Sequence, residues 1–100
     1  MVDGGAMTDT GVWDRLERLL EFPVVFPIKV MGRPVPGFAQ TIADLAREHC
    51  PDFDPGTMQM RPSSRGGWLS LTLNVRAQSR VQLEQLYRAL AAHPLVRVVL

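Results

Sequence analysis

The most regular pattern of apolar and polar positions in the chain runs from Trp68 to Ala77. Apolar residues alternate there with polar ones: Leu69, Leu71, Leu73 and Val75 alternate with Ser70, Thr72, Asn74 and Arg76. Side chains of a β-strand point to opposite faces in turn, so this alternation predicts a strand that is covered on one face only. We expect the leucine side to face the core and the hydroxyl-bearing side to remain uncovered.

Three segments have helical spacing instead. A short amphipathic helix is predicted from Val12 to Leu20, with Thr10 or Asp9 as its N-cap, and a second helix from Phe38 to His49. The third helix opens at a capping box made by Ser79 and Gln82 and closes at His93-Pro94. Prolines follow or interrupt each pattern, which sets the ends of the helices.

Three further strands are predicted. Residues 26–31 alternate, with Lys29 and Met31 on the uncovered side, residues 57–61 form a weaker strand, and residues 95–100 form the last one. The order after the first helix is therefore βαββαβ. Right-handed crossovers place both later helices on the same face of one sheet. We predict an α+β, ferredoxin-like two-layer sandwich: a four-stranded antiparallel sheet in the order 4-1-3-2, two helices on one face, and a short N-terminal helix.

Length and composition fit one domain. The chain has 100 residues, which we divide into a disordered tail at 1–11, rich in Gly, Thr and Asp, and a single domain at 12–100. The net charge of +1 provides no global attraction to nucleic acid or to an anionic membrane. The single cysteine excludes an intramolecular disulfide. No stretch approaches the roughly 20 apolar residues that a membrane-spanning helix needs, and the N-terminus does not resemble a signal peptide. A cytoplasmic location is therefore expected.

Candidate catalytic residues are few. His49 and His93 each stand at a predicted helix end, where we expect them to be solvated. Cys50 follows His49, but nothing local provides the base and the activating environment that a nucleophilic cysteine needs. No third ligand stands at metal-binding spacing, and no phosphate-binding or dinucleotide-binding glycine motif is present. The sequence predicts no enzyme activity, no cofactor and no metal site.

Two loops offer places for an anion. In the predicted hairpin loop, Ser63, Ser64, Arg65, Gly66 and Gly67 either form an anion-binding nest or serve only as turn residues. The turn that starts at Gly32 and Arg33 leads into a helix N-terminus, which favours anions, but it has the composition of any tight strand-to-helix turn. Both alternatives stay open for each loop.

The uncovered face of the sheet is either solvated or a contact surface. RNA-recognition domains have the same strand order and stack bases on aromatic residues of strands one and three. Here only Trp68 could stack, and strand one offers Lys29 and Met31, so the pattern disfavours nucleic acid.

The last strand is apolar on both sides apart from Arg97 and lies at a predicted sheet edge. Such an edge is normally covered or paired. We expect either that the N-terminal helix packs over it or that the protein forms a homodimer.

Four sequence blocks in this order resemble the YbeD-like family of small bacterial proteins of unknown function. The blocks are Leu19-Leu20-Glu21-Phe22-Pro23, Lys29-Val30-Met31-Gly32, Pro62-Ser63-Ser64-Arg65-Gly66 and Val96-Arg97-Val98-Val99-Leu100. The resemblance covers nearly all of residues 16–100. It implies a ferredoxin-like fold similar to ACT-type regulatory domains and an association with lipoate metabolism, and it carries no catalytic residues.

The leading hypothesis is a non-enzymatic regulatory or adaptor domain that binds a small anionic effector or a protein partner. The alternative is a single-stranded RNA-binding module that uses the uncovered sheet face. The candidate binding residues are Lys29, Gly32, Arg33, Ser63, Ser64, Arg65, Gly66, Trp68 and Arg97.

Overall fold

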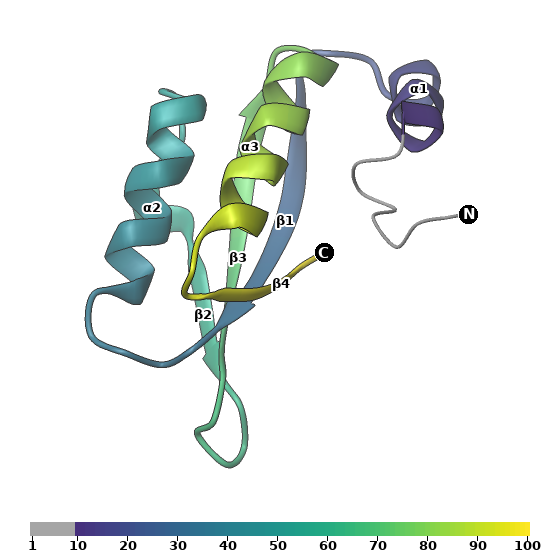
Figure 1. Ribbon diagram of the computed structural model, residues 1–100. Helices are drawn as coiled ribbons and strands as arrows, with labels where there is room; N and C mark the ends of the chain where they lie inside the picture. Colours follow the sequence, from purple (N-terminus) through teal and green to yellow (C-terminus); the bar gives the residue numbers. More distant parts are fainter. Residues whose placement is uncertain (1–9) are drawn as a thin grey trace.

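The computed structural model describes residues 10–100, which form three helices and one sheet (Figure 1). In chain order the elements are α1 (Thr10–Leu19), β1 (Val24–Gly32), α2 (Phe38–His49), a 3₁₀ turn (Pro55–Thr57), β2 (Gln59–Pro62), β3 (Leu69–Ala77), α3 (Arg80–Ala92) and β4 (Val96–Val99). The Phe22–Pro23 peptide bond between α1 and β1 is cis.

The sheet has the order β2-β3-β1-β4, and every neighbouring pair is antiparallel. This is the predicted 4-1-3-2 order counted from the opposite edge. Helices α2 and α3 lie side by side over one face of the sheet (Figure 1). The ferredoxin-like α+β sandwich predicted from the sequence is confirmed. The face turned away from α2 and α3 is called the open face below.

The core lies between the helices and the sheet. In β3, Leu71, Leu73 and Val75 are buried while Asn74 and Arg76 are exposed, so the predicted orientation of this strand is confirmed. Other large core side chains come from β1 and all three helices, among them Ile28, Val30, Trp13, Phe38, Ile42, Leu83, Leu86 and Leu90. Burial of this alternating strand beneath two amphipathic helices is the main force that holds the fold together.

All four strands differ from their predicted bounds, β3 and β4 by no more than a single residue at either end and β1 and β2 by more. β1 begins at Val24 because it pairs with β3 along its whole length, from Val24 opposite Ala77 to Gly32 opposite Leu69. β2 is shifted to Gln59–Pro62, and it can end in a proline because it is an edge strand. The segment before β2 folds into the 3₁₀ turn instead, which Asp54 caps by accepting a hydrogen bond from the Gly56 amide.

Helix α1 begins at Thr10, two residues before its predicted start, so Thr10 is part of the helix and is not its N-cap. The alternative cap, Asp9, and most of the predicted tail lie outside the described residues.

At the start of α3, one of the two hydrogen bonds of the predicted capping box is present. Ser79 Oγ accepts a hydrogen bond from the Gln82 amide at 3.2 Å. The Gln82 side chain does not return to Ser79. Its Oε1 accepts from the Gln78 amide and its Nε2 donates to the His49 carbonyl, which ties the start of α3 to the end of α2.

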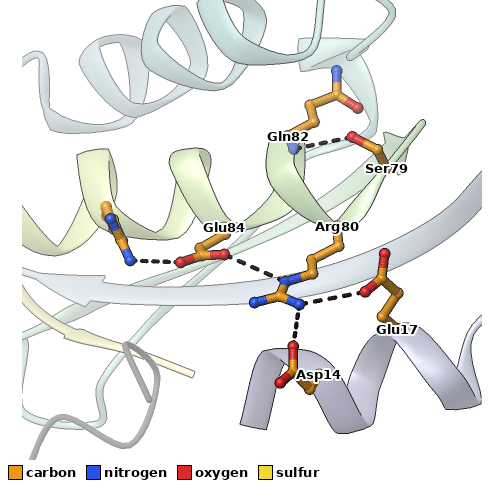
Figure 2. Close-up of polar contacts among 7 residues, drawn as sticks. Asp14, Glu17, Ser79, Arg80, Gln82 and Glu84 are labelled. Carbon is orange, nitrogen blue, oxygen red and sulfur yellow. Dashed lines mark hydrogen bonds and ion pairs between the residues drawn. The ribbon is translucent and has the colours of Figure 1, made fainter. Parts of the chain in front are cut away.

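Helix α1 packs on α3, and it makes no contact with β4 extensive enough to cover that strand. The Arg80 guanidinium, at the start of α3, bonds to Asp14 and Glu17 of α1 and pairs with Glu84 of its own helix (Figure 2). Trp13, which belongs to α1, is fully buried. The first of the two arrangements expected for the last strand, coverage by the N-terminal helix, is therefore wrong. β4 remains an edge strand among the described residues.

Candidate functional site

The open face carries a shallow hollow of about 360 Å³ across β1, β3 and β2. The residues that line it are Lys29, Gln59, Met60, Arg61, Ser70 and Thr72. Strand register explains why these residues meet. Lys29 on β1 lies opposite Thr72 on β3, and Thr72 lies opposite Gln59 on β2. Two residues further along both strands, on the same face, Ser70 of β3 lies opposite Arg61 of β2.

The two cations stand on the strands that flank β3, with the two hydroxyls between them. Neighbouring strands are about 4.8 Å apart, and alternate residues of one strand are about 7 Å apart. The side chains of Lys29 and Arg61 are therefore long enough to meet above Ser70 and Thr72. Both cationic residues are exposed, and the two hydroxyl residues are half-buried.

The charge on the sheet has one sign. None of the four strands contains an aspartate or a glutamate, and together they carry Lys29, Arg61, Arg76 and Arg97. Within residues 10–100, none of these four side chains forms an ion pair. The carboxylates that do pair with arginines lie on α1 and α3. A chain with a net charge of only +1 thus presents a positive face.

The hollow is suited to binding an oxyanion. Its lining supplies an ammonium group, a guanidinium group, two hydroxyls and an amide, all of which can donate hydrogen bonds. Hydrogen bonds from charged donors to a carboxylate or phosphate are the strong ones. The lining contains no carboxylate, imidazole or thiol.

The hairpin loop between β2 and β3 uses its polar groups internally. Ser63 Oγ accepts a hydrogen bond from the Trp68 amide at 3.1 Å, and the Ser63 carbonyl accepts one from the Gly66 amide at 2.9 Å. Gly66 has a φ of 74°, which favours glycine. The Ser63 amide also donates to the Trp68 carbonyl, so the amides of Ser63 and Gly66 are both committed to the turn, which favours the hairpin interpretation. Ser64 and Arg65 are exposed at its tip.

Gly32 and Arg33 differ in accessibility. Gly32 is buried, and a Cβ at this position would collide with the Leu95 carbonyl and lie 2.6 Å from the Phe38 ring. Gly32 therefore has a packing role. Arg33 is exposed and follows the last residue of β1, while Trp68 directly precedes β3. Because Gly32 lies opposite Leu69, Arg33 and Trp68 are the next residues along these two strands.

Arg97 is an extra residue in β4. Gly32 pairs with Val96 and Met31 pairs with Val98, so Arg97 forms a bulge, and it is exposed outside the hollow. Of the nine candidate residues from the sequence, the structure thus places only Lys29 in the hollow. Arg61, Gln59, Ser70 and Thr72 were missed as site residues, because the register that joins them to Lys29 involves the irregular strand β2.

The histidines are not merely solvated. Both are half-buried, and His93 Nδ1 accepts a hydrogen bond from the Leu95 amide at 3.1 Å, which fixes the turn into β4. Burial raises the pKa of the Cys50 thiol, and the negative charge of Asp52 raises it further. In the described part of the chain, no three His, Cys, Asp or Glu residues are grouped so that they could hold a metal ion. No helix there is long and apolar enough to cross a membrane.

Comparison with known proteins places the chain in a family. The profile described as "Protein of unknown function (DUF493)" matches residues 17–100. The chain belongs to the DUF493 family. That match covers every strand, α2 and α3, and all residues of the hollow. The resemblance to YbeD-like proteins inferred from the four sequence blocks is confirmed.

Similar proteins, each named as a UPF0250 protein, come from several bacteria. A UPF0250 protein of Ralstonia nicotianae is 54% identical over 92 residues, which are 92% of this chain and 95% of the relative. A UPF0250 protein of Bordetella pertussis is 54% identical over 84 residues, 84% of this chain and 92% of the relative. One from Nitrosomonas europaea is 45% identical over 84 residues, 84% of this chain and 97% of the relative. None of these three names states an activity.

Proposed function

We propose that this DUF493 protein is a non-enzymatic regulatory module that binds a small anionic ligand in the hollow of its open sheet face. The observation that carries the proposal is that Lys29, Arg61, Ser70 and Thr72 line one hollow, on a sheet whose strands contain no acidic residue. The hollow contains hydrogen-bond donors for an oxyanion and no carboxylate that would compete with it.

The expected affinity is modest. Each charge-assisted hydrogen bond contributes about 1.5–3 kcal/mol, and part of this is lost to the ordering of two long side chains. A simple anion held by Lys29 and Arg61 should therefore bind with a Kd on the order of 1 mM. A larger ligand that contacts more of the open face would bind more tightly.

Titration by NMR or calorimetry at low salt tests the proposal. The probes are inorganic phosphate, small carboxylates, amino acids and lipoate, the last because of the YbeD-like resemblance. We expect at least one of these anions to shift the amides of β1 and β3, and Lys29→Ala and Arg61→Ala to weaken its binding about tenfold or more. Arg47→Ala, an exposed arginine on α2, is the matched control. Absence of binding by every probe, or equal binding by all variants, would contradict the proposal.

The RNA-binding alternative finds less support. In RNA-recognition domains, bases stack on aromatic residues of the open face. Here the open-face positions of β1 and β3 hold Lys29, Met31, Ser70 and other non-aromatic residues. Only Trp68, which precedes β3, could stack on a base.

The outer edge of β4 supports a second part of the proposal, that the module works as a homodimer. β4 is an edge strand, and the side chains of Val98 and Leu100 remain exposed on or beside it. An edge strand with exposed apolar residues can pair with the same strand of a second copy.

A further inference from the structure

Trp68 does not line the hollow itself, but it directly precedes β3, which contributes Ser70 and Thr72 to the lining. It is 42% exposed although it is one of the largest apolar side chains in the protein. It lies two residues from Ser70 along the same stretch of chain. On a β-strand, residues two apart share a face and are about 7 Å apart. Continuation of the β3 spacing therefore places Trp68 on the same side of the chain as Ser70, beside the residues that line the hollow.

The backbone of Trp68 is held in place from both sides. Its amide donates to Ser63 Oγ at 3.1 Å, and its carbonyl accepts from the Ser63 amide at 2.9 Å. The indole is thus presented from a hydrogen-bonded hairpin and not from a loose loop. A rigid aromatic surface costs little entropy when a flat ligand stacks on it.

We propose that the ligand of the hollow is a nucleoside phosphate, whose base stacks on Trp68 and whose phosphate lies above Ser70 and Thr72 between Lys29 and Arg61. This inference rests on the proposed function, since it uses the same hollow. A free phosphate would leave the neighbouring indole without a role. A longer nucleic acid strand would need further aromatic residues on the open face, and the strands supply none there.

The stacked base should add measurable affinity. Stacking of one base on an aromatic side chain makes binding roughly 5- to 150-fold tighter. We therefore expect a nucleoside 5′-monophosphate to bind at least fivefold more tightly than inorganic phosphate. The unphosphorylated nucleoside should bind more weakly than the monophosphate, because it lacks the group that Lys29 and Arg61 recognise.

The experiment uses the intact protein, with inorganic phosphate, adenosine, and the four nucleoside 5′-monophosphates as probes. Trp13 and Trp68 are the two tryptophans of the chain, and Trp13 is fully buried. Quenching of fluorescence by a stacked base therefore reports Trp68, and calorimetry or NMR supplies the affinity for phosphate. Trp68→Leu should lower the affinity for monophosphates to that for phosphate and leave phosphate binding unchanged. Trp68→Phe should restore part of the difference.

The outcomes separate this inference from the proposed function. If phosphate binds and no monophosphate binds at least fivefold more tightly, or if Trp68→Leu weakens both equally, the nucleotide assignment is wrong and the anion site stands. If neither phosphate nor any monophosphate binds, the nucleotide assignment is again wrong. The anion site then depends on the carboxylate probes. A ten-nucleotide single-stranded RNA that binds over 100-fold more tightly than the monophosphates, with steep salt dependence, would show that the occupant is a strand and would overturn the inference.

Discussion

The ring of Tyr87 meets the ring of Trp13 edge to face, with the centroids 5.5 Å apart and the ring planes at 69°. Tyr87 Oη also donates a hydrogen bond to the Leu100 carbonyl at 3.0 Å. One side chain of α3 thus contacts both α1 and the residue that follows β4. Both rings are buried, so this contact joins the first helix to the core.

Removal of the Trp13 ring should therefore destabilise the whole domain. We expect Trp13→Ala to lower the free energy of unfolding by about 3–5 kcal/mol, because a large buried side chain is lost and a cavity remains. Tyr87→Phe keeps the ring contact, loses the bond to Leu100, and should cost about 1 kcal/mol. Urea denaturation followed by circular dichroism measures both. A loss below about 1 kcal/mol for Trp13→Ala would show that α1 adds little to the core.

The hydroxyl of Tyr87 should titrate late. Burial raises its pKa to about 12 from the ordinary value of 10.0. The folded state holds this proton more tightly than the unfolded state does. The resulting contribution to stability is complete below pH 10 and is lost as the pH rises through about 12. Tyr87 is the single tyrosine of the chain, so absorbance at the tyrosinate band follows it directly. A midpoint near pH 10 in the native protein would contradict this prediction.

Gly32 should not tolerate a side chain. We expect Gly32→Ala to cost about 1–3 kcal/mol, because its methyl group would collide with the Leu95 carbonyl and the Phe38 ring. Gly67→Ala is the matched control, since nothing lies within 4 Å of a Cβ at that position. Thermal denaturation of both variants provides the comparison. Equal melting temperatures would mean that Gly32 has room that the structure does not show.

Arg80 should hold α1 in place. Arg80→Met removes the bonds to Asp14 and Glu17 and retains most of the side-chain length. We expect faster amide hydrogen exchange in α1 and little change in the strands. Arg88→Met removes an arginine that pairs only with Glu84, and it serves as the control. If α1 exchanges equally slowly in both variants, the Trp13 contact alone is sufficient to hold the helix.

The proposed homodimer predicts a change of mass on substitution of β4. Val98→Lys places a charge on the exposed edge and should convert a dimer into a monomer in light scattering. Val25→Lys is the control, because Val25 is also an exposed strand valine and lies on β1, inside the sheet. A monomeric wild-type protein, or a dimer that survives Val98→Lys, would refute pairing through β4.

Sequence periodicity was sufficient for the elements with one strong pattern. The bounds of α2 were predicted exactly, because its apolar stripe is bounded by a glycine and a proline. The two faces of β3 were also predicted, because leucines alternate there with hydroxyl residues. The bounds of β2 were predicted less accurately, because all four of its residues are exposed and no alternation of buried and exposed positions marks its ends.

The candidate site was likewise predicted only in part from the sequence. The positive residues are visible in the sequence, and Lys29 was assigned to the uncovered face. Arg61 was not connected to it, because the two stand on strands separated by β3 and only the register of both ladders brings them to one hollow. Conversely, Gly32 looked like part of a ligand loop, although its neighbours Phe38 and Leu95 are distant in the chain and require the space for packing.

The sequence by itself determined the order of helices and strands, which face of β3 is apolar, and the family, because these depend on local spacing or on short blocks of residues. Tertiary structure alone decided that α1 packs on α3, that Ser63 closes the hairpin, and that Lys29 and Arg61 line the same hollow. These features depend on strand register and on contacts between distant segments, which balance many weak interactions across the folded chain and leave no periodic trace in the sequence.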